Sequence, residues 1–443
     1  MSEWKKVKIG DVCKIVKGTT GIAGAEPGKY PLVVTAVERK TCSTYQFDCE
    51  AVCIPLVSSS GHGKKSLNNV HFQSGKFALG TILCAVIPNN SDELDARYLH
   101  QYLQFYKDTV LVPLMKGAAN VSLSMKDIAG VSIPLPPIQR QRELAGMFVM
   151  LQQKQKELFA EFEKQTEYAK QLRQNILQEA IEGKLTADWR KQHPVQKGNP
   201  DYDAQALLDC LQQKKESLKK DPLVKREKIR TPVGDTEKEF SIPNNWIWIR
   251  MGELCYPITK GTTPDVHEIK ADGEIPYLKM FNIVNQKLDF DYRPQYISKK
   301  VHDEKLTRSK VYPNDVIMNI VGPPMGKIAM VTDEFPEWNL NQAMAIFRGY
   351  DISINPYIYV FLNSMIWFKY VHTLGVVGQE NMSLEQCKDI AVALPPLAEQ
   401  KEIVARVEKH LEAITQLETQ IATRETTTKQ LMQSILKNAF EEK

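Results

Sequence analysis

The sequence predicts an α+β protein built from two pseudo-twofold-related mixed α/β domains separated by an antiparallel two-helix coiled coil. Three observations support this fold class. The chain has 443 residues, which is more than one hydrophobic core usually contains. Its two halves repeat one another in order, and each half ends in a long stretch with apolar residues every 3.5 positions.

Composition places the chain among globular proteins, because 25% of its residues are charged and 43% are hydrophobic. Its net charge of +4 neither requires nor excludes a nucleic-acid partner. No apolar run approaches the ~20 residues of a membrane span, and the first residues lack the apolar core of a signal peptide. We therefore expect a cytoplasmic protein. Reduced thiols are expected for its cysteines, with a zinc site at Cys49, Cys53, His62 and His71 as the minor alternative.

The repeat begins with the first residues. The Trp, Gly and Cys of 4–13 return in 246–255, and the Gly-Thr-Thr of 18–20 returns at 261–263. The Leu-Pro-Pro of 135–137 returns at 394–396, and from there the offset stays at 259 residues (395 − 136) to the end of each helix. An Asn-x-Ser-Leu pattern at 120–123 also matches 381–384. Ordered matches over a whole unit indicate tandem duplication.

Each repeat combines a mixed α/β domain with a helix. In domain 1 (1–137), short β-type runs lie at 9–16, 32–36, 51–57 and 81–87, broken by Gly, Pro and Asn. Domain 2 (246–396) has similar runs at 275–278, 316–321, 327–331 and 343–347. Both domains end at a Pro-Pro step, which is typical of a helix start.

The two predicted long helices, 138–183 and 397–443, carry matching heptad ladders. From Leu144, steps of four and three predict a seam of Phe148, Leu151, Gln155, Leu158, Phe162, Gln165, Ala169, Leu172 and Ile176. From Ile403 they predict Val407, His410, Ile414, Leu417, Ile421, Arg424, Thr428, Leu431 and Ile435. Such a ladder favours a coiled coil over two independent amphipathic helices, and a pseudo-twofold axis would make the helices antiparallel. The polar interruptions Gln155, Gln165, His410 and Arg424 are candidates for fixing the register.

Residues 184–245 are expected to form a linker with a short helix around 204–220. The linker carries a basic run made of Lys219, Lys220, Lys225, Arg226, Lys228 and Arg230. We favour a solvated linker here, with a phosphate or partner contact as the alternative.

Catalytic and nucleotide-binding motifs are absent from the sequence. It contains no GxxxxGK[ST] loop, HExxH, GxSxG or kinase set. The stretch Asn199-Pro200-Asp201-Tyr202 is only faintly similar to the motif of adenine methyltransferases, and we attribute it to chance. We expect no catalytic residue, no metal site and no cofactor in this chain.

The ordered motifs resemble the specificity subunit of type I restriction–modification enzymes, and the resemblance covers essentially the whole chain. It is carried by Trp246…Gly252-Glu253, Gly261-Thr262-Thr263-Pro264, Glu274-Ile275-Pro276-Tyr277, Gly322…Gly326, Asn341-Gln342, Leu394-Pro395-Pro396, Glu399-Gln400 and the tail 431–436. The helix end 172–177 with 183–185 is also similar to the family. Domain 1 departs from the pattern, because it has no evident Asn-Gln counterpart.

This resemblance implies two target-recognition domains, each reading one half of a bipartite, asymmetric DNA site, with the helices setting the spacer. It implies two modification subunits that use S-adenosylmethionine to methylate adenine by base flipping, and restriction subunits that use ATP and Mg²⁺. This chain would supply sequence specificity alone. The alternatives are a repeated-domain scaffold that binds protein or carbohydrate and, more weakly, a methyltransferase or nuclease in its own right.

Candidate DNA contacts are polar and basic residues in expected loops. In domain 1 they are Lys17, Thr19, Thr20, Ser59, His62, Lys64, Lys65, Lys116 and Asn120. In domain 2 they are Lys260, Thr262, Thr263, Lys279, Asn282, Arg293, Lys299, Lys300, Arg308, Lys310, Asn341, Gln342, Gln379 and Asn381. We expect the recurring Lys-Gly-Thr-Thr to contact the DNA backbone or to hold the fold rather than to read bases. For Asn341-Gln342 we favour structural hydrogen bonding over readout of adenine. The loop around Ser59–Lys65 is either a DNA contact or a surface loop.

Overall fold

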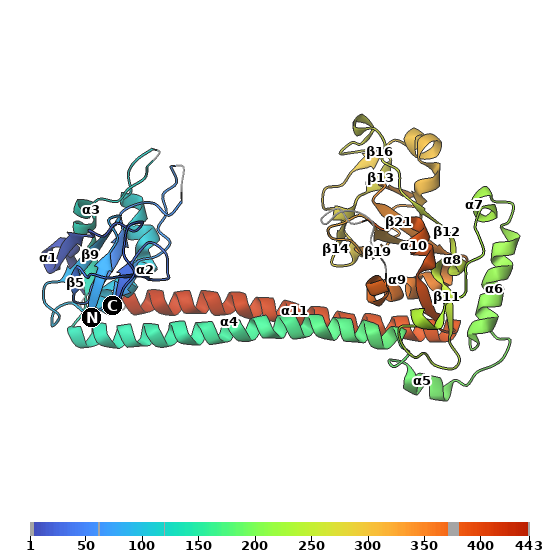
Figure 1. Ribbon diagram of the computed structural model, residues 1–443, viewed down its shortest axis with the longest axis horizontal. Helices are drawn as coiled ribbons and strands as arrows, with labels where there is room; N and C mark the ends of the chain where they lie inside the picture. Colours follow the sequence, from blue (N-terminus) through green and yellow to red (C-terminus); the bar gives the residue numbers. More distant parts are fainter. Residues whose placement is uncertain (1–3, 61–62, 119, 371–380, 442–443) are drawn as a thin grey trace. The chain divides into compact units, whose positions relative to one another are not determined.

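The computed structural model describes residues 4–60, 63–118, 120–370 and 381–441 (Figure 1). The chain forms two compact units. Unit 1 comprises Met1–Gln165 and Ile421–Lys443, and unit 2 comprises Thr166–Gln420. Among the described residues, no helix is both long and apolar enough to cross a membrane.

Unit 1 contains two four-stranded sheets and a separate strand pair. Its elements are β1 (Lys5–Lys8), α1 (Ile9–Val12), β2 (Cys13–Lys17), β3 (Tyr30–Val33), β4 (Lys40–Cys42), β5 (Phe47–Asp48), β6 (Ala51–Pro55), β7 (His71–Gln73), β8 (Lys76–Leu79), β9 (Leu83–Pro88), α2 (Ala96–Val110), η1 (Val112–Leu114), α3 (Met125–Ala129) and β10 (Ser132–Leu135). The sheet orders are β2-β9-β6-β7 and β4-β3-β8-β5, and β1 pairs with β10. All of these strand pairs are antiparallel except β3 with β8.

Unit 2 repeats this arrangement with different segments between the strands. Its core elements are β11 (Ile247–Arg250), α8 (Met251–Leu254), β12 (Cys255–Lys260), β13 (Ile275–Leu278), β14 (Ile283–Val284), β15 (Lys287–Leu288), β16 (Tyr296–Ile297), β17 (Lys310–Val311), β18 (Val316–Asn319), β19 (Ile328–Met330), β20 (Trp338–Leu340), β21 (Met344–Gly349), α9 (Asn355–Asn363), α10 (Leu384–Asp389) and β22 (Ala391–Leu394). Short helical turns lie between them at η3 (Val266–Glu268), η4 (Met280–Asn282), the π-helix η5 (Val301–Lys305), η6 (Thr307–Ser309), η7 (Ile352–Ile354) and η8 (Ile366–Tyr370).

The strand orders of unit 2 match those of unit 1 element by element. Its sheets run β12-β21-β18-β19 and β16-β13-β20-β17, and β11 pairs with β22. Here too one pair is parallel, β13 with β20, at the place of β3 with β8. The predicted α+β class and the predicted tandem duplication are both confirmed.

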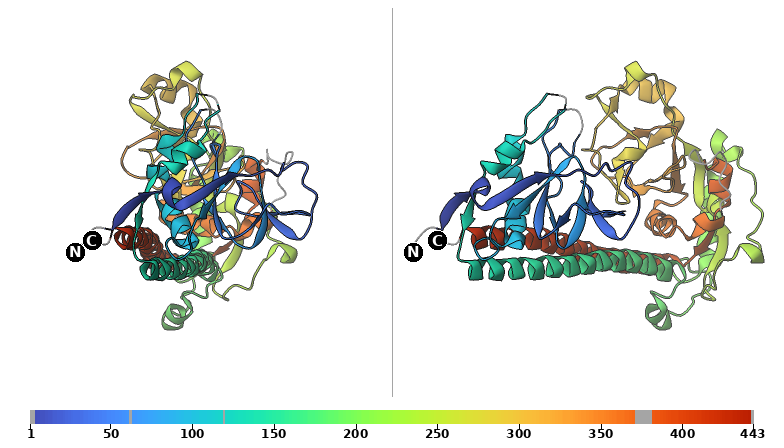
Figure 2. Two further views of the ribbon diagram at one scale, coloured as in Figure 1. Left: turned by 90° about the vertical axis from the view of Figure 1, so that its left-hand side faces the viewer. Right: turned by 60° about the vertical axis from the view of Figure 1, so that its left-hand side comes forward.

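The long helices are α4 (Ile138–Ile181) and α11 (Leu397–Phe440), drawn side by side in Figures 1 and 2. In unit 1, the ring of Phe148 lies 4.7 Å from that of Phe440, and Phe162 lies 5.5 Å from the guanidinium of Arg424. In unit 2, Arg173 donates to Glu418 at 3.0 Å. Positions advance along α4 as they recede along α11, so the pairing is antiparallel within each unit, as expected.

The same glutamine side chain organises the start of both helices. Gln141 and Gln400 are 259 residues apart and almost fully buried. Each donates through Nε2 at 2.8 Å to the carbonyl of the first proline of its Pro-Pro pair, Pro136 or Pro395. The buried amide therefore has a partner, and the repeated Leu-Pro-Pro-x-x-x-Gln pattern has a local structural cause.

The predicted seam of α11 is wrong at alternate positions. Leu417 and Leu431 are 43% and 58% exposed, and His410 and Arg424 are exposed as well. The less exposed residues follow them by one: Leu411, Glu418, Glu425 and Met432. Arg424 still reaches the Phe162 ring of α4 through its guanidinium. In α4, Leu172 is likewise 47% exposed while Arg173 turns inward. Where the ladders placed Leu172 and Leu417, Arg173 meets Glu418 at 3.0 Å across the helix pair.

Residues 184–245 pack on unit 2, although we expected a solvated linker. They form α5 (Ala187–Gln192), α6 (Ala204–Ser217), α7 (Pro222–Lys225) and η2 (Asp235–Glu237), and α6 agrees with the expected short helix. The Arg230 side chain is only 9% exposed and reaches Glu385 at 2.8 Å and Asp389 at 2.9 Å. At least one member of the basic run is therefore a packed residue.

Candidate nucleic-acid interface

The recurring Gly-Thr-Thr segment packs against a neighbouring chain reversal in both units. A Cβ on Gly18 would lie 2.2 Å from the Gly80 carbonyl oxygen, and one on Gly261 would lie 2.1 Å from that of Asn341. Thr20 and Thr262 donate backbone N–H bonds to the Leu79 and Leu340 carbonyls. Thr19 and Thr263 are exposed, as are Lys17 and Lys260 at the ends of β2 and β12. The recurrence of this segment thus has a structural cause whether or not its exposed side chains contact DNA.

Five candidates of unit 1 come together on two adjoining loops, 58–66 and 116–122, which we call the loop pair. They are Ser59, Lys64, Lys65, Lys116 and Asn120, and all are exposed. The Ser58 amide donates to the Val121 carbonyl at 3.0 Å and joins the two loops. The loops rise from the side of unit 1 opposite α4 and α11 (Figure 1). His62 lies outside the described residues.

Serine side chains hold the first of these loops in shape. The Ser58 hydroxyl donates to the Lys64 carbonyl at 2.6 Å and accepts from the Ser66 amide at 3.1 Å. Ser59 accepts from the Asn68 amide at 3.0 Å, so its hydroxyl helps to close the loop. Two cations extend from this ordered turn, Lys64 and Lys65, and in the described part of the chain neither forms an ion pair. Lys116 pairs with Asp127 at 3.2 Å, but its side chain is still 76% exposed.

The sequence match between Asn120 and Asn381 is two residues out of structural register. Ser124 caps α3 and Ser383 caps α10, so the offset there is 259. Consistently, the Leu123 amide donates to Leu56 and the Met382 amide donates to Ile320. Asn381, which is exposed, therefore corresponds to Ser122. The helix caps and backbone hydrogen bonds define the register, and the short Asn-x-Ser-Leu sequence match does not follow it.

The amide side chains of unit 2 differ in accessibility. Asn282 is 1% exposed, and its Nδ2 donates to the Tyr292 carbonyl at 2.9 Å while its Oδ1 accepts from the Lys279 amide at 3.0 Å. The side chain is thus held within its own loop in this structure, and its contact with DNA stays a prediction. Asn341 Oδ1 accepts from the Ala343 amide at 3.2 Å, which fits the structural role that we favoured. Gln342 is exposed, and Gln379 lies outside the described residues.

The predicted basic cluster of unit 2 divides into paired and unpaired cations. Lys299 contacts Asp303 at 3.2 Å and Glu337 at 3.5 Å, and Lys310 pairs with Asp303 as well. The remaining members are exposed and form no ion pair with any described carboxylate: Arg293, Lys300 and Arg308. Lys279 is half-buried, with its Nζ 6.0 Å from the Tyr277 ring centre.

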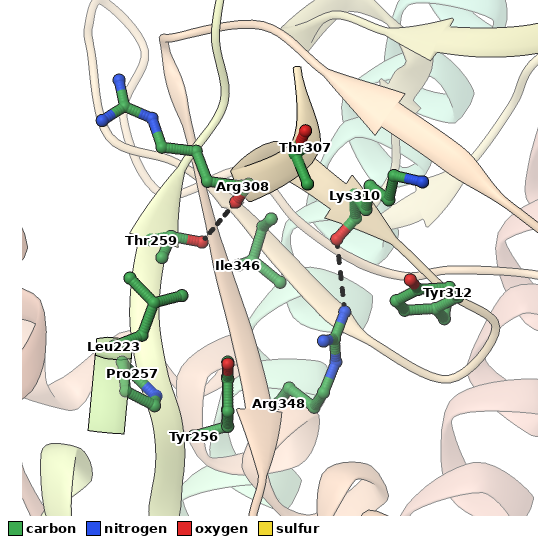
Figure 3. Close-up of a pocket in the computed structure, with 10 residues that line it drawn as sticks. All are labelled: Leu223, Tyr256, Pro257, Thr259, Thr307, Arg308, Lys310, Tyr312, Ile346 and Arg348. Atoms are coloured by element: carbon green, nitrogen blue, oxygen red, sulfur yellow. Dashed lines mark hydrogen bonds between the residues drawn. The ribbon is translucent and has the colours of Figure 1, made fainter. Parts of the chain in front are cut away.

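Arg308 lies at the rim of a polar cavity of about 170 Å³ in unit 2. Figure 3 shows its lining: Leu223, Tyr256, Pro257, Thr259, Thr307, Arg308, Lys310, Tyr312, Ile346 and Arg348. Arg348 is fixed in the wall, because it donates to the buried Asp315 carboxylate at 2.7 and 2.5 Å and its guanidinium lies 4.7 Å from the Tyr312 ring centre. The Arg308 guanidinium points away from this wall (Figure 3) and is available to a phosphate.

Several of these lining residues were not among the candidates predicted from the sequence, including Tyr256, Tyr312 and Arg348. They come from separate segments on β12, on β21 and beside β17, and α7 adds Leu223. No short motif joins them, so only the folded chain brings them together.

His302, Asp303 and Glu337 place three metal-type ligand atoms within 4.8 Å of one another. His302 is fully buried, and its Nδ1 accepts from Asn339 Nδ2 at 3.1 Å. The Asn339 amide is oriented by a second bond from Nδ2 to the Leu306 carbonyl. The histidine proton is therefore on Nε2, which faces Glu337 at 3.4 Å. Burial and the charge of Lys310 lower the pKa of His302, so its ring is neutral beside the ion pairs that Lys299 makes with Asp303 and Glu337.

Comparison with known proteins places this fold in a family. The family model for the type I restriction modification DNA specificity domain matches residues 1–178 and 243–424. Among the relatives is the type I restriction enzyme EcoEI specificity subunit of Escherichia coli, 28% identical over 259 residues, 56% of this chain and 41% of that protein. Another is the EcoBI specificity subunit of Escherichia coli, 28% identical over 324 residues, 72% of this chain and 59% of that protein. The matched parts thus span about half the length of these relatives.

A solved structure shares the fold over its whole length. It is a chain of a type I R-M system whose complex assembly and conformational transition were determined. It has a TM-score of 0.67 and 16% identity, and the match covers 100% of this chain and 98% of that one. Because the family model matches well over half of the sequence, in both units, this chain belongs to the family of type I restriction modification DNA specificity domains.

Proposed function

We propose that this chain is the DNA specificity subunit of a type I restriction–modification complex and that it reads a bipartite, asymmetric DNA site. The observation that carries this proposal is one strand order used twice with unlike loops. Two copies of one frame can approach two half-sites in the same way, while different loop side chains select different bases. Family membership supports this function over a scaffold that binds protein or carbohydrate.

Two unlike loops begin at equivalent backbone bridges in the two frames. Val57 bridges to Ser122 in unit 1, and Val321 bridges to Asn381 in unit 2. Beyond these bridges, unit 1 has the serine-ordered turn with Lys64 and Lys65. Unit 2 has Gly-Pro-Pro-Met at 322–325 instead. Hydroxyls and ammonium groups offer hydrogen-bond donors that the proline-rich turn lacks, which favours two unlike half-sites.

The helix pair would set the spacer between these half-sites. Both α4 and α11 have 44 residues and belong to both units. One heptad adds about 10 Å, or roughly three base pairs. A seven-residue insertion in both helices should therefore widen the unspecified gap by up to about three base pairs and leave the half-sites unchanged. An unchanged gap in the methylated sites of the host genome would contradict the spacer role.

The chain itself would be non-catalytic and cytoplasmic and would bring no cofactor. Two modification subunits would carry S-adenosylmethionine, and restriction subunits would carry ATP and Mg²⁺. In support, the sequence lacks phosphate-loop, metallopeptidase and kinase motifs. Methyl transfer by the purified chain alone would contradict this part of the proposal.

Exchange of residues 1–137 for the first domain of another member of the family tests the modular assignment. Genome-wide mapping of methylated adenine should show one altered half-site and one retained half-site. A change in both half-sites, or a change in neither, would contradict the assignment of one half-site to each unit.

The loop pair can be tested separately with Lys64→Ala/Lys65→Ala. If both lysines contact phosphates, affinity for duplex DNA should fall about tenfold, and the slope of log affinity against log salt should flatten by about two. A matched control is Lys156→Ala/Lys164→Ala, because these exposed lysines of unit 1 lie on α4. Equal behaviour of the two double variants would remove the loop pair from the interface.

A further inference from the structure

The face of unit 2 built by β11, α8 and α10 is covered by the chain's own residues 214–240. Lys215 donates to Glu253 at 2.7 Å, and the Arg230 amide donates to the same carboxylate at 3.2 Å. Arg230 also reaches Asp389 and Glu385. Two cations of the segment thus pair with carboxylates of the frame, while Lys388 of α10 pairs in the opposite sense with Glu227 of the segment at 2.7 Å.

Further contacts extend this docked surface. Arg250 of β11 donates to the Glu237 carboxylate at 2.9 and 2.7 Å. The ring of Phe240 lies 4.9 Å from that of Trp248, and Tyr256 donates to Asp221 at 2.5 Å. The docking therefore combines ion pairs with one aromatic contact.

Unit 1 builds the same face from β1, α1 and α3, which we call the α1/α3 face. β1 pairs with β10 as β11 pairs with β22. The Ile9 amide donates to the Val131 carbonyl at 2.9 Å, and Met251 makes the equivalent bond to Ile390 at 2.9 Å. A Cβ on Gly10 would lie 3.0 Å from Ala129 Cβ, which repeats the distance from Gly252 to Lys388 Cβ. The backbone surface is the same in both units.

This surface is more basic in unit 1 than in unit 2, although the cation Lys388 becomes Ala129 there. At the offset of 259 residues, Glu385 becomes Lys126 and Asp389 becomes Gly130. At the offset of 242 residues, Trp248 becomes Lys6 and Tyr256 becomes Lys14. The basic Arg250 becomes Lys8 and keeps its charge sign. Asp11 is the one acid retained, in place of Glu253. These lysines are exposed, and in the described part of unit 1 none of them forms an ion pair.

We propose that the α1/α3 face of unit 1 docks a protein segment that presents carboxylates. The equivalent face of unit 2 shows that this backbone surface accepts a polypeptide, and the four exposed lysines require the opposite charge from the one that Arg230 and Lys215 bring to unit 2. Residues 214–240 of a second copy are therefore a poor match. The inference does not depend on the proposed DNA-reading function.

A charge-swapped peptide provides the probe. It has the sequence of residues 221–240 with glutamate in place of its five cations, Lys225, Arg226, Lys228, Arg230 and Lys238. Fluorescence anisotropy with the full chain at low salt should show tighter binding of this peptide than of a scrambled peptide of equal composition. Lys6→Glu/Lys8→Glu/Lys126→Glu should weaken that binding at least tenfold, whereas Lys156→Glu/Lys164→Glu on α4 should not.

The unmodified 221–240 peptide should show the reverse preference and bind the triple-glutamate variant better than the wild-type chain. Because the substituted lysines are exposed, the variant should unfold at the same denaturant concentration as the wild type. Equal binding of the acidic and scrambled peptides would overturn the proposal. So would a triple variant that keeps its affinity for the acidic peptide and loses affinity for a 20-base-pair duplex, since the face would then serve DNA.

Discussion

Units 1 and 2 share one backbone frame and differ in what surrounds it. In unit 2 the chain's own residues 184–245 pack on the frame, and a buried carboxylate, Glu399, accepts from Thr186, Arg190, Asn245 and Trp246. In unit 1 the equivalent position holds Arg140, which pairs with Glu143 at the surface. The difference teaches that the repeat preserves what the backbone needs, while one equivalent position can hold a buried carboxylate in unit 2 and a partly exposed, ion-paired cation in unit 1.

The largest expected effect contrasts these two positions. Glu399→Ala should destabilise unit 2 by about 3–5 kcal/mol, because it leaves the Arg190 guanidinium and other donors without their buried acceptor. Arg140→Ala should change the stability of unit 1 by under about 0.5 kcal/mol. Five of the six tryptophans lie in unit 2, so fluorescence-detected denaturation follows it. Equal effects would break the comparison.

A smaller effect should be the same in both units. Gly18→Ala and Gly261→Ala should each cost about 3 kcal/mol, because the new Cβ would lie within 2.2 Å of a carbonyl oxygen. The control is Gly146→Ala on α4, where a Cβ meets nothing within 4 Å and helix propensity should stabilise the chain slightly. Hydrogen exchange of each unit would measure the change. A tolerated alanine at either position would show that the frames are not equivalent.

The corrected helix seam gives the next prediction. Met432→Ala should destabilise unit 1 by about 2 kcal/mol, since the side chain is 8% exposed. Leu431→Ala, at a 58% exposed position, should change stability by under about 0.5 kcal/mol. Urea denaturation compares the pair directly. If Leu431→Ala were the costlier change, the original ladder would be right.

The smallest effect depends on pH. Burial, and then the charge of Arg39, lower the pKa of His71 from 6.5 to about 4, so the folded chain holds this ring neutral. The unfolded chain binds the proton more readily. The free energy of unfolding of unit 1 should therefore fall by on the order of 2 kcal/mol as the pH falls from about 6.5 to about 4. The equivalent position of unit 2 holds the buried Ala329, which carries no titratable group. His71→Ile should remove this acid sensitivity, and an unchanged pH profile would contradict it.

Much of the architecture was predictable because its causes are local or periodic. The Pro-Pro steps and apolar ladders predicted helices at 138–183 and 397–443, and α4 and α11 end within three residues of those limits. The phase of the seam was not predictable, because a ladder through Leu417 fits the apolar pattern until the facing helix is known. The contact across the pair is made instead by the next residue, Glu418, which meets Arg173 at 3.0 Å.

The candidate DNA contacts were chosen by residue type and by their expected place in loops. Neither criterion reports whether a side chain turns toward solvent or toward its own loop. Asn282 illustrates this, because its amide satisfies backbone groups of the loop that carries it. All of the candidates stay predictions until DNA binding is measured.

The internal repeat, the apolar periodicity and the Pro-Pro steps of the chain therefore establish the duplicated α+β plan and its long helices. Each of these features depends on neighbours within a few residues or on an order that recurs. Folding alone settles which side chains meet across long separations: the cavity beside Arg308, the docking of Arg230 and the exposed lysines of the α1/α3 face. Burial and charge pairing act through space, so the residues that flank a position in the sequence do not identify partners hundreds of positions away.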